Sequence, residues 1–159
     1  MVRSSSPRSL ERGLYPTAAD THQVFVNTKQ NTENPWQLPR PAAVIVAGLG
    51  PEGELRGSDL VKTVRQSVIA WGQRLTELPK VPAVFSLATT LLGSGGAGIT
   101  AGQAAQLIAQ GVREANDQMS GKRSERRRWP CVGELQIIEL YLDRATEAWR
   151  SLQELEKAS

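Results

Sequence analysis

The sequence has 159 residues, of which 40% are hydrophobic and 22% are charged, and its formal net charge is +3. These values predict one globular domain with its own core, because the chain is too short for two ordinary domains. The single cysteine, Cys131, excludes an internal disulfide framework and a cysteine-based zinc site. No apolar run approaches the roughly 20 residues that cross a bilayer, and no apolar segment follows Met1–Arg8 as in a signal peptide. We therefore expect a cytoplasmic protein without membrane contact.

Residues 1–12 are rich in serine and arginine and are expected to form a disordered tail. The folded α/β domain is assigned to residues 13–159. Residues 21–27 are β-prone and predict a short strand, whereas two prolines exclude regular structure from residues 28–40. Pro41–Ala47 is a continuous apolar run, which is typical of a strand buried on both faces.

The rest of the sequence alternates between helix and strand patterns. Apolar residues recur at steps of three and four between Ser58, a predicted N-cap, and Pro79, and they predict a helix. The further elements are expected in this order: a strand over 84–92, a helix capped by Thr100, a strand over 132–142 and a helix over 143–157. The last helix is expected to bury Ala148 and Trp149. Such strand–helix repeats predict a three-layer α/β fold, in which helices flank a mainly parallel sheet.

The stretch after the strand at 84–92 is the strongest candidate for a ligand site. It consists of Gly93, Ser94, Gly95, Gly96, Ala97 and Gly98. Consecutive backbone N–H groups in such a loop can converge on a phosphate, and the next helix adds its positive N-terminal end. A tight turn without a ligand explains the same residues, so both interpretations stay open.

Dinucleotide binding is not favoured, although Gly93–Gly98 and Gly48–Gly53 both match the spacing of dinucleotide-binding loops. Neither run is followed by an acidic residue about 20 positions later, at the end of the next strand, as such a site requires. Neither run ends in the Gly-Lys-Ser/Thr of a Walker A loop. We therefore expect no cofactor.

Basic residues gather in a short run, which consists of Lys122, Arg123, Arg126, Arg127 and Arg128. Trp129 follows directly, and a nucleic-acid base could stack on it. A single basic loop in an otherwise neutral domain is more typical of a solvated connection. The run is a candidate contact surface, but nucleic acid is not the expected partner.

Candidate catalytic groups are few. His22 is the only histidine, in a polar segment. Glu134, Glu139 and Asp143 cluster around the last predicted strand, where partial burial is expected to raise the pKa of Glu139. A structural hydrogen bond is the expected role of Glu139, because no nucleophile–base pair surrounds it. We predict no catalytic residues, no metal site and no enzymatic activity.

Several stretches together resemble an accessory region of large bacterial multidomain proteins. In those proteins the region accompanies a CHAT domain, which is a caspase-like peptidase, or an α/β-hydrolase-like segment. The stretches are Gly13–Pro16, Val24–Val26, Val44–Leu55, Leu92–Ile99 and Glu139–Ala145. The order of strands, glycine turns and helices is also similar, more remotely, to macro domains and to the amino-terminal domain of leucyl aminopeptidases.

The resemblance implies an accessory module and not the peptidase, because Cys131 and His22 lie in no peptidase context. Strand-forming sequence precedes Gly13 in the family, so a truncated form of the module is expected here. The implied role is interaction or regulation in a bacterial signalling or defence assembly, with a peptidase or effector domain as partner. The macro-domain likeness implies an alternative, which is binding of ADP-ribose or another nucleotide at residues 93–98. The asparagine-rich segment that contributes to ADP-ribose handling is missing, so hydrolase activity is not expected.

Overall fold

The computed structural model describes residues 15–28, 33–34, 41–95, 98–121 and 129–157. Their elements follow one another in this order: β1 (His22–Val26), β2 (Ala43–Ala47), α2 (Gly57–Leu75), β3 (Val84–Thr90), α3 (Ala101–Gly121), β4 (Cys131–Ile138) and α4 (Leu142–Lys157). This arrangement confirms a mixed α/β fold. No helix in the described ranges is long and apolar enough to cross a membrane.

The four described strands form two separate pairs. β1 runs antiparallel to β2, with Phe25 opposite Val44. β3 runs parallel to β4, with Thr90 opposite Ile138. β2 and β3 share no ladder of hydrogen bonds, so parallel pairing is found only between β3 and β4 among these strands.

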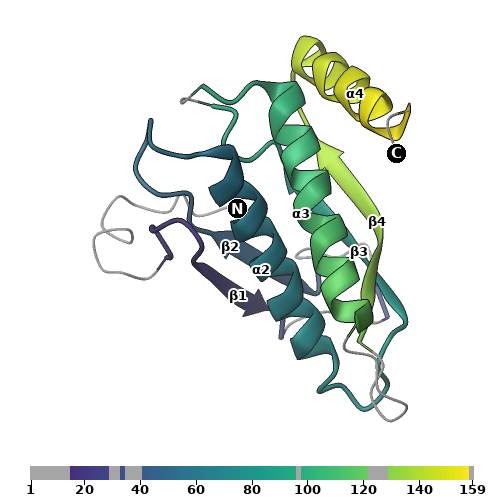
Figure 1. The fold of residues 1–159 in the computed structure, drawn as a ribbon. Coiled ribbons are helices and arrows are strands. Elements are labelled where there is room, and N and C mark those ends of the chain that lie inside the picture. Colours follow the sequence, from purple (N-terminus) through teal and green to yellow (C-terminus); the bar gives the residue numbers. More distant parts are fainter. Residues whose placement is uncertain (1–14, 29–32, 35–40, 96–97, 122–128, 158–159) are drawn as a thin grey trace.

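The helices α2 and α3 pack side by side on one face of the strands (Figure 1). In the view of Figure 1, β1 and β2 lie behind α2, and β3 and β4 lie behind α3. The helix α4 packs against α3, near the end at which α3 begins. The described elements therefore form a helix layer on a strand layer, and the predicted third layer is not confirmed.

The core lies between the two long helices and the strands. Leu60 on α2 and Ile108 on α3 are 0% and 1% exposed, and Met119 is also fully buried. Gly111 lets the helices approach closely, because a Cβ atom there would lie 2.8 Å from the carbonyl oxygen of Val61. The steps of three and four that predicted both helices thus mark the faces that meet in this core.

The helix starts differ in how their free N–H groups are satisfied. Thr100 and Gln103 form a reciprocal cap on α3: Gln103 N donates to Thr100 Oγ1 (3.2 Å), and Thr100 N donates to Gln103 Oε1 (3.1 Å). This confirms the predicted cap. The prediction of Ser58 as a cap is wrong, because α2 already begins at Gly57, and Arg56 at its N-cap position makes no side-chain cap bond.

The described helices leave the opposite face of the strands open. In β3 the exposed residues alternate with half-buried ones, as expected for a strand covered on one face only. Val84 is 60% exposed, Ile138 is 54% exposed and Val44 is 51% exposed. The prediction that β2 is buried on both faces is therefore wrong, because the described helices α2 and α3 cover only one face.

Candidate functional site

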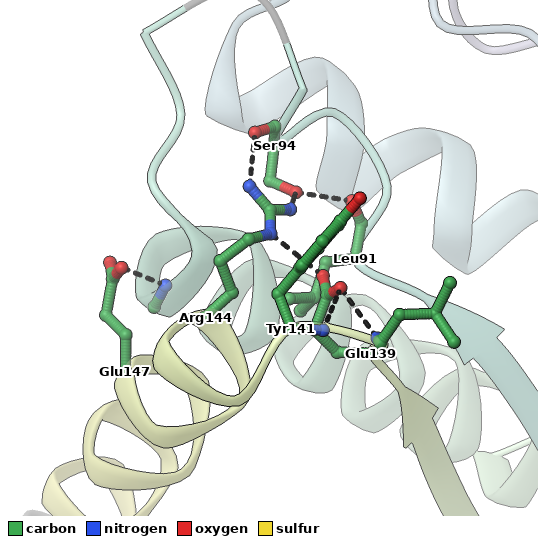
Figure 2. Close-up of polar contacts among 8 residues, drawn as sticks. Leu91, Ser94, Glu139, Tyr141, Arg144 and Glu147 are labelled. Atoms are coloured by element: carbon green, nitrogen blue, oxygen red, sulfur yellow. Dashed lines mark hydrogen bonds and ion pairs between the residues drawn. The ribbon is translucent and has the colours of Figure 1, made fainter.

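Polar contacts join the loop after β3 to the start of α4 (Figure 2). Arg144 donates from Nε to Glu139 Oε2 (3.0 Å) and from Nη2 to Ser94 Oγ (2.6 Å). The Ser94 hydroxyl in turn donates to the carbonyl oxygen of Leu91 (2.7 Å). These contacts fix the β3–α3 loop against α4, and they occupy the guanidinium group that could otherwise bind an anion.

Glu139 closes the N-terminal end of α4. Its Oε1 accepts hydrogen bonds from the backbone N–H groups of Leu140 (2.8 Å) and Tyr141 (3.2 Å). The hydrogen bond from Arg144 and these backbone N–H groups hold the pKa of Glu139 below its ordinary value. The prediction of a raised pKa is therefore wrong, because hydrogen bonds to the ionised form outweigh desolvation. The predicted structural role is confirmed.

A second carboxylate lies at the N-terminal end of α3. Glu147 Oε1 accepts a hydrogen bond from Gly102 N (3.0 Å), and this contact is the largest cause of its lowered pKa. The backbone N–H of Gln103 already donates a hydrogen bond to Thr100 Oγ1. A phosphate bound at this helix end would have to compete with Glu147 for the N–H of Gly102.

The candidate phosphate loop is described only in part, because Gly96 and Ala97 lie outside the described residues. Gly93 and Gly98 have positive φ angles, both 78°. A Cβ atom at Gly93 would lie 2.6 Å from Leu55 Cδ2, whereas nothing lies within 4 Å of a Cβ atom at Gly95 or Gly98. Gly93 is thus required for the turn and its packing, and anion binding by the whole loop stays a prediction.

The other glycine run, Gly48–Gly53, packs against the segment before β1. Gly48 N donates to Thr21 O, and Gly50 N donates to Thr17 O, both at 2.8 Å. A Cβ atom at Gly48 would overlap the carbonyl oxygen of Ala18. The close approach of two backbones explains this glycine without a ligand.

The remaining candidates that the structure describes do not assemble into a reactive site. The basic run at 122–128 lies outside the described residues. Glu134 accepts hydrogen bonds from Ser86 (3.2 Å) and Gln136 (3.0 Å) on the strands, apart from the contacts of Glu139. His22 lies in β1. Among the described residues, no group of three or more His, Cys, Asp or Glu side chains could hold a metal ion.

The sequence did not indicate a groove that lies between β2 and β3. It is a cavity of about 440 Å³, and residues of both strands line it together with residues of α2. None of its lining residues is charged. The uncharged run at 41–47 was the one available signal, but its apolar character is equally typical of a strand within a continuous sheet.

A scan against protein-family models finds no match for this sequence, and a search of curated proteins finds none either.

Proposed function

We propose that this chain is a non-catalytic interaction module that binds and regulates a peptidase or effector domain. The observation that carries the proposal is the open face of the strand layer. Phe25 and Val44 are paired on this face, and Val84 and Ile138 are also exposed. Large apolar side chains exposed on one sheet face are typical of a surface that a protein partner covers.

A second apolar surface supports the same function. Leu140, Tyr141 and Leu142 follow β4 and are 90%, 65% and 82% exposed. Trp149 is 62% exposed, so the prediction that α4 buries it is wrong. Leu142 and Trp149 are two turns apart on α4, which places them on the same side of the helix, away from Ala148, its buried residue.

The proposed partner is a CHAT-type, caspase-like peptidase domain, on the basis of the resemblance described above. A partner on the open face would supply the third layer of the predicted macro-like arrangement. Nucleotide binding is the less favoured function, because Glu147 already accepts the hydrogen bond from Gly102 N that an anion at the start of α3 would use.

The proposal is tested by sedimentation of the purified chain with a purified CHAT-type peptidase domain from the same organism. We expect a complex that the paired substitutions Val84→Asp and Ile138→Asp weaken by at least about tenfold, since each buries a charge at the interface. Gln73→Asp, at an exposed position of α2, introduces the same charge on the helix side and is the control. Absence of a complex, or equal binding by the paired variant when circular dichroism shows it folded, contradicts the proposal.

A further inference from the structure

We propose that the groove between β2 and β3 binds an extended, uncharged peptide strand, which pairs with both strands at once and comes from outside residues 1–159. The inference deepens the proposed function, because it identifies the part of a protein partner that this chain would recognise. It rests on the two strand edges, on the chemistry of the groove and on one buried hydroxyl.

The first observation is that, among the described strands, only β1 pairs with β2, which leaves its other edge without a strand partner. Asn27 N donates to Ala42 O, and Gly48 N donates to Thr21 O, so even-numbered residues of β2 direct their peptide groups toward β1. The peptide groups of Ala43, Ile45 and Ala47 consequently point away from β1. All three residues line the groove.

The second observation is the free edge of β3. Cys131 N donates to Ala83 O, so residues 83, 85, 87 and 89 direct their peptide groups toward β4. The peptide groups of Ser86 and Ala88 point to the other edge, and both residues line the groove. No other described strand pairs with β3 on that edge. Two unpaired edges that border one groove are the arrangement into which a peptide strand can be added.

The third observation is the chemistry of the groove. Val64, Val68 and Trp71 of α2 line its helix side, so inward side chains of the occupant must be apolar. Ser67 is the exception: it is only 7% exposed, lines the groove, and its hydroxyl has no hydrogen-bond partner among the residues that the structure describes. A buried hydroxyl without a partner is costly. The occupant is therefore expected to place one hydroxyl or amide group opposite Ser67.

These features select a peptide over other ligands. A charged nucleotide would find no charged lining residue, and a small apolar molecule would leave the peptide groups of both edges unpaired. Each described strand already belongs to one of the two strand pairs, so none of them is left to occupy the groove. The sequence outside the described ranges has no run of five residues without a charge or a proline. The occupant therefore comes from outside residues 1–159.

The test uses the full chain and a synthetic peptide of seven residues, with valine at inward and threonine at outward positions. One inward valine is replaced by serine, and two lysines flank each end to keep the peptide soluble. Fluorescence of Trp71, which lines the groove, reports binding, and Trp71→Phe identifies its signal. We expect a dissociation constant below about 1 mM.

Three comparisons separate strand pairing from general hydrophobic binding. A peptide N-methylated at alternate residues keeps its side chains but loses backbone donors, and we expect at least about tenfold weaker binding. Ser67→Ala should remove the preference for the serine peptide over its all-valine counterpart. Ser67→Phe should fill the groove and abolish binding, whereas Ser58→Phe, at an exposed position of the same helix, should not.

Equal binding of the N-methylated peptide, or no binding by folded protein, overturns the inference. A dimer in which a second copy occupies the groove, and which the peptide does not dissociate, overturns the choice of occupant. If Ser67→Phe leaves the peptidase-domain complex intact while Val84→Asp with Ile138→Asp abolishes it, the groove is rejected and the proposed function stands. If the peptide binds but no complex with the peptidase domain forms, the proposed function is rejected instead.

Discussion

The two sides of the strand layer have opposite properties. On the helix side, Leu60 and Ile108 are fully buried, and Gly111 lets α2 and α3 pack closely. On the open side, Val84 and Ile138 leave more than half of their surface in water. The helix side therefore supplies most of the free energy of folding, whereas the apolar area of the open side stays in water, where the function proposed above would use it for binding. Similar apolar residues therefore contribute very differently to stability, according to whether other elements of the chain cover them.

The largest expected effect is a loss of unfolding free energy on the helix side. It is measured by making the same isoleucine-to-alanine substitution on each side of the strand layer. Ile108→Ala should lower the free energy of unfolding by about 2 to 5 kcal/mol, because it removes buried methyl groups and leaves a cavity. Ile138→Ala should lower it by less than about 1 kcal/mol, which reflects strand preference alone. Urea unfolding followed by circular dichroism measures both. Similar losses for the two variants would show that the open side is already packed in the isolated chain.

A smaller effect is expected in the loop after β3, where two glycines face different surroundings. Gly93→Ala should cost about 1 to 3 kcal/mol of unfolding free energy, because φ is 78° and the new Cβ atom would meet Leu55 on the helix side. Gly95→Ala should change stability by less than about 0.5 kcal/mol, since its Cβ atom meets nothing within 4 Å. Thermal melts of the two variants compare them directly. A costly Gly95→Ala would show that the open part of the loop is also constrained.

The smallest expected effect is the pH dependence of the stability that Glu139 contributes through its contacts at the start of α4. The folded-state pKa of Glu139 lies below the ordinary value of 4.5. Its stabilising contribution is therefore present above pH 4.5 and is lost as the pH falls through the lowered pKa. Glu139→Gln should lower the melting temperature at pH 7 and have a smaller effect at pH 3, whereas Glu156→Gln, at an exposed position late in α4, should have little effect at either pH. A larger loss at pH 3 than at pH 7 would contradict this linkage.

Local patterns in the sequence were sufficient for most elements. The steps of three and four placed the helices now seen as α2, α3 and α4, and Thr100 was identified as a cap from its residue type and its place before the helix. These features depend on neighbours along the chain, so they can be read without the fold. The ends were less certain: β4 stops at Ile138, although the apolar pattern continues to Leu142. Glu139 ends the strand by turning to cap α4, which the pattern alone does not reveal.

Only the tertiary structure decided which apolar residues are covered and which backbone edges stay free. An apolar strand such as Ala43–Ala47 has the same composition whether it lies inside a continuous sheet or beside a groove. The exposure of Trp149 likewise depends on the direction in which α4 packs. The pKa of Glu139 is lowered because the chain turns after β4 and brings the Arg144 side chain and the backbone N–H groups of Tyr141 and Leu140 to its carboxylate. The groove between β2 and β3 exists because two strands of the same chain lie on α2 and α3 without pairing with each other. Spacing between strands is set by packing between distant segments, and no local pattern encodes it.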